Sequence, residues 1–224
     1  METMLEIVGA AMYGALALVA IWGAFCVVVV WRRVAQTRFR NEADQREFLD
    51  ELDQNLNSGN VEAAIELCEG DRRAMPQLAL LALANREQGY AKLRQMVVDR
   101  FQRDVLADLE YRLSWVYTVI KSAPMIGLLG TVVGMMGAFA KLGSGEKVDP
   151  GLMAKDISLA LITTALGLLI AIPLVICTAS INVRIRKMED LVGVGLMRLM
   201  DTLKTFLSRP TKKEKAESRR PVAP

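Results

Sequence analysis

Long uncharged runs alternate with charged segments along the chain, and this alternation predicts where the chain crosses a membrane. The runs are 7–31, 122–140 and 157–183. A helix needs ~20 apolar residues to cross the hydrocarbon core of a bilayer, so each run can form or complete a span. The acidic residues Glu2 and Glu6 precede the first run, and Arg32 and Arg33 follow its last residue, Trp31. This arrangement favours a retained transmembrane helix over a cleaved signal peptide.

We therefore predict an all-α membrane protein with three transmembrane helices, long cytoplasmic extensions and a helical cytoplasmic insert. The predicted segments are a periplasmic N-terminus at 1–6, a transmembrane helix at 7–31, the insert at 32–112, a transmembrane helix at 113–141, a periplasmic loop at 142–156, a transmembrane helix at 157–183, a cytoplasmic amphipathic helix at 184–208 and a basic disordered tail at 209–224.

The positive charges flanking the spans predict the orientation. The arginines and lysines next to the spans on the insert side are Arg32, Arg33, Arg38, Arg40, Arg112, Lys121, Arg184, Arg186 and Lys187. The opposite side has an acidic N-terminus and a loop with balanced charge. Because positive residues favour the cytoplasmic side, we expect a periplasmic N-terminus and a cytoplasmic C-terminus in the bacterial inner membrane.

Helix signals within the insert predict its local structure. Residues 58–60 can cap a helix that begins at Val61 and ends near Gly70, and Pro76 suits the first turn of the next helix. From about Tyr90 the apolar spacing predicts one helix that continues into the second span. We favour a plain helical hairpin over a TPR-like repeat because no second copy is visible. For the tail, solvated disorder is favoured over attraction to anionic lipid.

Composition removes several classes of function. The chain has 224 residues, 52% of them hydrophobic, a net charge of +3, three cysteines and no histidine. The lack of histidine excludes Ser-His-Asp triads, Cys-His nucleophiles and His-ligated metals. The cysteines have no ligand-like spacing. We therefore expect no enzyme, metal or cofactor, and no nucleic acid as a partner.

Two spans carry small residues at helical spacing. They are Gly127, Gly130, Gly134 and Gly137 in the second span, and Ala160, Gly167 and Ala171 in the third. Such faces let helices approach closely within a membrane, so we predict that they pack against other helices. Pro124 and Pro173 lie in the same two runs and are predicted to have structural roles.

Threonines provide the polar groups near mid-membrane. Thr131 and Thr164 lie at similar predicted depths in antiparallel spans, and a ring of subunits would turn their hydroxyls into a polar collar. Thr163 is a weaker candidate for a place in the same collar. A membrane threonine often bonds a carbonyl of its own helix, and from sequence physics alone this packing interpretation is favoured for either main threonine.

The two spans resemble those of a known family. The run Ala-Pro-x-x-Gly-Leu-Leu-Gly-Thr-Val-x-Gly-Met-Met at 123–136 is similar to the second-span signature of MotA, TolQ and ExbB proteins. The run Ile-Ser-x-Ala-Leu-x-Thr-Thr-Ala-Leu-Gly-Leu-x-x-Ala-Ile-Pro at 157–173 resembles their third-span signature. Three spans and a large insert point to the ExbB/TolQ branch, because MotA proteins have four spans.

The resemblance implies a pentameric ring around a dimeric, single-span ExbD/TolR-like partner whose transmembrane Asp carries protons. It implies that the proton motive force drives a periplasmic or outer-membrane process such as biopolymer transport, with a TonB/TolA-like energy transducer as a further candidate partner. In this resemblance, Thr131 and Thr164 match the pore-lining threonines of the family.

The chain departs from the family pattern at two places. Leu159 stands where these proteins usually have Glu, and Thr178-Ala179 replaces a frequent Tyr-Asn pair. An ionisable pore residue is normally the functional one, so here the carboxylate must come from a partner. The alternative hypothesis is a passive oligomeric scaffold whose glycines serve only assembly, and proton flux distinguishes the two.

Overall fold

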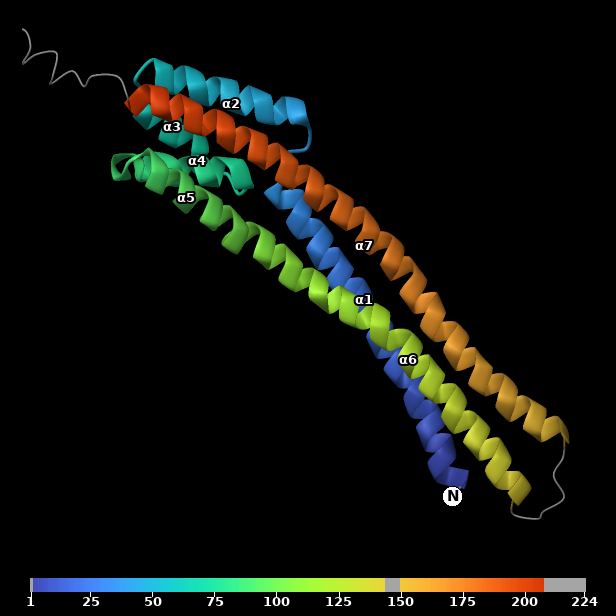
Figure 1. Cartoon of the computed structure of the whole chain (residues 1–224). Helices are drawn as coiled ribbons and strands as arrows, with labels where there is room; N and C mark the ends of the chain where they lie inside the picture. The colour runs from blue at the N-terminus through green and yellow to red at the C-terminus, as the bar shows by residue number, and fades with distance from the viewer. Residues whose placement is uncertain (1, 144–149, 208–224) are drawn as a thin grey trace, which may run out of the picture. The chain divides into compact units, whose positions relative to one another are not determined.

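The computed structural model describes residues 2–143 and 150–207, and these residues form helices joined by short turns (Figure 1). The elements are α1 (Glu2–Thr37), α2 (Glu42–Asn57), α3 (Val61–Cys68), α4 (Ala74–Ala84), the 3-10 turn η1 (Arg86–Gln88), α5 (Tyr90–Arg100), the π-helical segment η2 (Phe101–Leu106), α6 (Ala107–Gly143) and α7 (Pro150–Leu207). No strand occurs among the described residues, and three helices are long and apolar enough to cross a membrane. These findings confirm the predicted all-α class with three span-length helices.

The chain divides into two compact units. The spanning unit comprises residues 1–32 and 109–183, and the insert unit comprises residues 33–108 and 184–224. α1, α6 and α7 each continue from one unit into the other. The predicted tail at 209–224 and residues 144–149 of the predicted loop lie outside the described residues. The described part of that loop is helical, because α7 begins at Pro150 rather than at Ile157.

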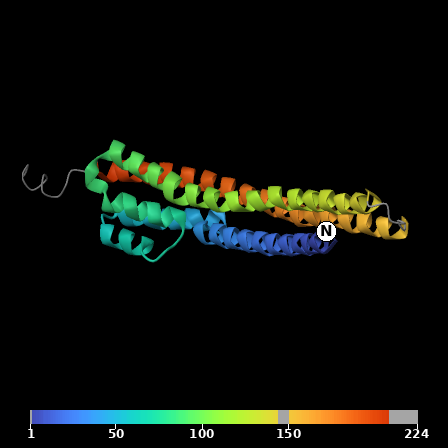
Figure 2. The ribbon, with the colours of Figure 1, turned by 90° about the horizontal axis from the view of Figure 1, so that it is seen from below.

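In the spanning unit, α1, α6 and α7 lie side by side, as the two views in Figures 1 and 2 agree. α1 packs on both other helices at Gly23, where a methyl group would lie 2.7 Å from a Val119 side-chain carbon and 2.9 Å from one of Leu174. Large apolar side chains such as Leu18 and Leu169 are exposed on the outside of this unit. Such a surface suits lipid, which solvates apolar side chains.

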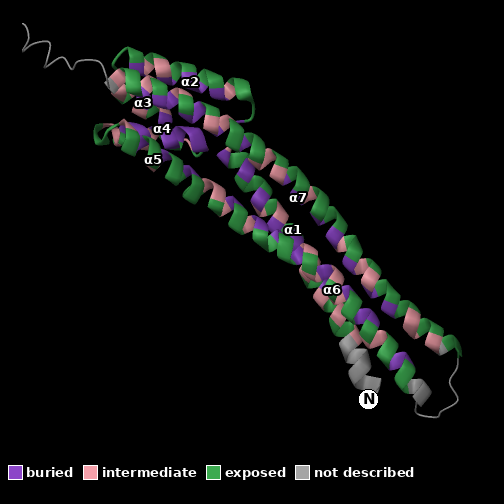
Figure 3. Cartoon of the chain, viewed as in Figure 1, coloured by how far each residue is buried: buried purple, intermediate pink, exposed green. Residues whose placement is uncertain are grey.

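In the insert unit, consecutive helices pack against each other, α2 on α3, α3 on α4 and α4 on α5. Most of α4 is buried (Figure 3). The predicted signals act as expected: the Asn60 side chain accepts a hydrogen bond from the Ala63 amide (3.2 Å), and Gly70 has φ +79° after α3, a conformation that glycine adopts without strain. Pro76 lies in the first turn of α4, where its missing N–H costs nothing.

The insert is larger than the plain hairpin that the sequence predicts. α3 and α4 form that hairpin, but α2 packs on α3 as well. The single helix expected from Tyr90 is interrupted by η2, a π-helical segment. Such segments are rare within α-helices, and the apolar spacing did not predict this one.

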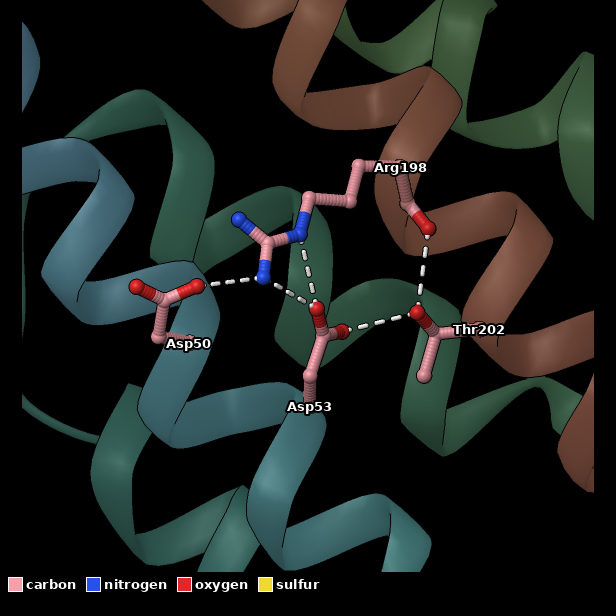
Figure 4. Close-up of polar contacts among 4 residues, drawn as sticks. All are labelled: Asp50, Asp53, Arg198 and Thr202. Atoms are coloured by element: carbon pink, nitrogen blue, oxygen red, sulfur yellow. Dashed lines mark hydrogen bonds and ion pairs between the residues drawn. The ribbon is translucent and has the colours of Figure 1, made fainter.

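A polar clamp joins α2 to the C-terminal part of α7 within the insert unit (Figure 4). The Arg198 guanidinium donates to Asp53 (2.7 Å) and to Asp50 (2.5 Å), and the Thr202 hydroxyl donates to the other oxygen of Asp53 (2.7 Å). The hydrogen bond to Asp50, and then the one to Asp53, raise the pKa of Arg198 above its ordinary value. Nearby, the Gln45 amide donates to the Leu191 carbonyl (2.6 Å).

Candidate functional site

The small-residue faces of α6 and α7 meet each other within one chain of the spanning unit. A methyl group at Gly127 would lie 2.7 Å from the Thr163 carbonyl oxygen and 2.9 Å from the Thr164 Cα atom. At Gly134 it would lie 2.6 Å from the Ala160 Cβ atom. The two backbones therefore approach so closely that a side chain at these glycines would push the helices apart.

The same close contact continues toward the other end of the helix pair. A methyl group at Gly167 would lie 2.6 Å from the Ala123 carbonyl oxygen and 3.1 Å from the Pro124 Cα atom. Gly137 and Ala171 are also buried. Pro124 and Pro173 lie inside α6 and α7 without ending either helix, which membrane helices tolerate when neighbours satisfy the freed backbone groups.

Thr131 is buried and satisfied by its own helix. Only 6% of its surface is exposed, and its hydroxyl donates to the Leu128 carbonyl (2.7 Å). This is the bond one turn back that threonine commonly makes in membrane helices. Within one chain, the Thr131 hydrogen is already used, although the hydroxyl oxygen can still accept a hydrogen bond.

Thr163 lies between the two helices. It is 4% exposed, and its hydroxyl faces two carbonyl oxygens, that of Ala160 in α7 (2.7 Å) and that of Gly127 in α6 (3.1 Å). A methyl group at Gly130 would lie 2.5 Å from the Thr163 hydroxyl oxygen. The structure therefore places Thr163 in the contact between α6 and α7.

Thr164 differs from both neighbours in its hydrogen bonding. Its hydroxyl oxygen is buried, yet it has no hydrogen-bond partner among the residues that the structure describes. A buried polar group without a partner is costly, and in native proteins such a group calls for an explanation. Of the three candidate threonines, Thr164 alone has a hydroxyl available to donate to a group from another molecule.

The sequence supplies no carboxylate to this region, because the apolar runs contain no charged residue. At the position of the family's usual Glu, the Leu159 side chain is 45% exposed. The Leu159 carbonyl accepts a hydrogen bond from the Tyr13 hydroxyl of α1 (3.1 Å). Any proton carrier at mid-membrane must therefore come from outside this chain.

Two polar contacts of the spanning unit were not predicted from the sequence. One is the Tyr13–Leu159 bond, and the other joins the Asn182 amide of α7 to the Tyr117 hydroxyl of α6 (2.8 Å). A tyrosine or asparagine within an apolar run signals that a partner is needed. That signal does not identify the partner, which is more than sixty positions away in both cases.

The insert unit offers weaker candidates for chemistry. Burial, and then the nearby Asp71 charge, raise the pKa of Cys68 to about 12, so its thiol stays protonated and unreactive at neutral pH. A groove of about 440 Å³ lies between α5–η2 and α7, lined by Phe101, Leu196 and Met197 among others. Among the described residues no cluster of His, Cys, Asp or Glu could hold a metal ion.

Comparison with known proteins matches the region that contains this site. The model of the MotA/TolQ/ExbB proton channel family matches residues 73–192. The biopolymer transport protein ExbB of Aquifex aeolicus is 34% identical over 115 residues, which cover 50% of this chain and 76% of that protein.

Two further relatives match shorter stretches. The Tol-Pal system protein TolQ of Haemophilus influenzae is 36% identical over 104 residues, covering 46% of this chain and 44% of TolQ. The biopolymer transport protein ExbB of Helicobacter pylori is 42% identical over 74 residues, covering 33% of this chain and 51% of that protein. Apart from the Aquifex protein, the chain spans about half the length of these relatives or less.

Proposed function

Because the chain belongs to the MotA/TolQ/ExbB proton channel family, we propose that it is the channel subunit of an inner-membrane, proton-driven motor of the ExbB/TolQ type. In this proposal the subunits form a pentameric ring with periplasmic N-termini and cytoplasmic C-termini. Proton flow through the ring energises a periplasmic or outer-membrane process such as biopolymer transport, which is named for several relatives. The chain itself catalyses no reaction.

The ring encloses a single-span ExbD/TolR-like partner whose transmembrane Asp carries the protons, and a TonB/TolA-like transducer passes the energy on. The sequence supports an external carboxylate, because all three apolar runs lack charge and Leu159 replaces the family's usual Glu. The chain must then supply the groups that receive this carboxylate, and hydroxyls suit that role because they both donate and accept hydrogen bonds.

The observation that carries the proposal is the Thr164 hydroxyl, which is buried and has no partner among the described residues. A group of this kind is stabilised when a carboxyl or a water molecule comes within hydrogen-bond distance. Thr131 and Thr164 together form the proposed collar, with Thr131 contributing as an acceptor because its own hydrogen is used at Leu128.

Proton flux through co-expressed channel and partner tests the proposal. We expect little flux from the chain alone, flux upon co-expression of its single-span partner, and loss of that flux when the partner's Asp is changed to Asn. The double variant Thr131→Val/Thr164→Val should abolish most of the flux. Unchanged flux in that variant would contradict the collar.

Thr178→Val is the matched control. Thr178 lies in the same helix as Thr164 and is buried, but its hydroxyl donates to the Leu174 carbonyl one turn back (2.7 Å). Its replacement removes a hydroxyl from the span without touching the collar, so flux should persist. Loss of flux in this control would indicate a general packing effect.

The alternative of a passive scaffold requires the glycine face of α6 for assembly. Gly127, Gly130 and Gly134 instead contact α7 of the same chain, which argues against a free glycine surface between subunits. Absence of flux with every co-purifying partner would favour the scaffold over the channel.

A further inference from the structure

We infer that Thr163 is a positioning residue, whose hydroxyl keeps the neighbouring Thr164 hydroxyl available for a group that enters from outside the chain. This inference deepens the proposed function and rests on it. It assigns Thr163 to the contact between α6 and α7 rather than to the pore lining.

Thr163 of α7 packs closely against α6. Its side chain fits over Gly130, where a methyl group would lie 2.5 Å from the hydroxyl oxygen and 2.9 Å from the Thr163 Cβ atom. Its hydroxyl reaches the Gly127 carbonyl at 3.1 Å. A steric notch and a directional hydrogen bond at the same residue together fix the rotation of α7 against α6.

The Ala160 carbonyl lies four residues before Thr164 in α7 and is one possible acceptor for the Thr164 hydroxyl. A threonine in a membrane helix commonly donates to such a carbonyl. The oxygen has two lone pairs: the helix uses one for the amide of residue 164, and the Thr163 hydroxyl lies 2.7 Å away from the same oxygen. The Thr163 hydroxyl, whose one hydrogen is shared between the Ala160 and Gly127 carbonyls, therefore crowds one of the carbonyls of its own helix to which Thr164 could otherwise donate.

The Thr164 hydroxyl lacks such a hydrogen bond. Its hydroxyl oxygen is buried and has no partner in the described part of the chain, although Gly127 brings the α6 backbone next to its Cα atom. Adjacent positions of an α-helix point about 100° apart. With Thr163 held toward α6, Thr164 is turned to a different direction, where its hydroxyl has no hydrogen-bond partner among the described residues.

Infrared spectroscopy of an introduced thiol tests this inference without any partner. Thr164→Cys is made in a chain whose cysteines are replaced (Cys26→Ala, Cys68→Ala, Cys177→Ala), and its S–H stretching band is recorded in lipid bilayers. With Thr163 intact the band should lie at the frequency of an unbonded thiol. Thr163→Val frees the Ala160 carbonyl and should shift the band to the lower frequency of a bonded thiol, whereas Thr163→Ser should leave it unshifted.

Proton flux with the co-expressed partner provides the second readout. Thr163→Val should lower flux to the level of Thr164→Val, the double variant should lower it no further, and Thr163→Ser should restore it. A bonded thiol with Thr163 intact, or the same band in all three backgrounds, would overturn the inference. Absence of partner-dependent flux in the unaltered chain, with the band shift as expected, would instead refute the proposed channel function alone.

Discussion

The two units of this protein differ in the residues at which their helices approach most closely. In the insert unit the core consists of large apolar side chains such as Leu52, Met75 and Leu83, all essentially inaccessible. In the spanning unit, α6 and α7 approach most closely at glycines that face alanine and threonine, while large side chains such as Leu128 and Met125 are exposed. Figure 3 shows this contrast between the mostly buried α4 and the extensively exposed α6.

The difference follows from the solvent of each unit. In water, burial of a large apolar side chain is favourable, so leucine and methionine gather inside. In lipid the same burial yields no such gain, and helices associate through close backbone packing and interhelical hydrogen bonds. Denaturants can separate the two cases, because urea acts on water-exposed structure and detergent micelles of sodium dodecyl sulfate act on helix association in membranes.

The optical probes also separate the units. The chain has three tryptophans, Trp22, Trp31 and Trp115, and all of them belong to the spanning unit. Tryptophan fluorescence therefore follows the spanning unit, and the loss of helical circular dichroism in urea follows the insert unit.

The largest effect is expected for Leu52→Ala. Leu52 is 0% exposed, and truncation of such a core leucine typically costs about 3 kcal/mol through lost burial and the remaining cavity. The urea midpoint should fall markedly while the detergent midpoint of tryptophan fluorescence stays in place. Leu128→Ala, at a side chain 59% exposed in the spanning unit, is the control and should change neither midpoint much.

Gly127→Ala should destabilise the spanning unit by about 1–3 kcal/mol, since overpacking at a close contact forces backbones to move. The added methyl group would meet backbone atoms of Thr163 and Thr164, which cannot rotate away. The detergent midpoint of tryptophan fluorescence should fall, while the urea midpoint of circular dichroism should stay unchanged. Gly14→Ala is the matched control, because nothing lies within 4 Å of its added methyl group; an equal loss there would contradict the packing argument.

The polar clamp should contribute about 1 kcal/mol to the free energy of unfolding of the insert unit. In a double-mutant cycle of Arg198→Ala with Asp53→Asn, urea unfolding should reveal this coupling, because the Asp53 side chain is only 16% exposed. The cycle with Asp50→Asn should give a coupling of only a few tenths of a kcal/mol, because the Asp50 side chain is 67% exposed and solvent screens such pairs. Equal couplings would show that exposure does not set the strength of the clamp.

The smallest effect is expected for the pH dependence of the stability of the insert unit. Burial alone would raise the pKa of Asp71, but hydrogen bonds and charge from Arg73 outweigh it and hold the pKa below its ordinary value. A carboxyl whose pKa is lower in the folded state stabilises that state above its unfolded pKa, and this contribution is lost as the pH falls through the folded value. Asp71→Asn should therefore flatten the dependence of the urea midpoint on pH below about 4, while leaving the detergent midpoint unchanged.

Prediction from the sequence succeeded where the signal is local. The capping Asn60 and the Gly70 stop predicted α3, and Pro76 predicted the first turn of α4, because capping and φ preferences act within a few residues. It failed for η2, because π-helical segments are rare within α-helices. It also understated the insert at α2, although Phe48, Leu49, Leu52 and Leu56 recur there at helical spacing. The paired faces of α6 and α7 were predicted as packing surfaces, but not that they pack against each other within one chain.

By itself, the sequence determined the three apolar runs, the helical class, the small-residue faces and the motifs of the family, since each depends on residues near each other along the chain. Only the tertiary structure distinguishes the hydrogen bonding of the two adjacent threonines. Thr163 and Thr164 are adjacent and chemically identical, and no periodicity separates them. Their surroundings differ because the Gly127 carbonyl and Gly130 lie beside Thr163, and these contacts exist only once α6 and α7 have come together.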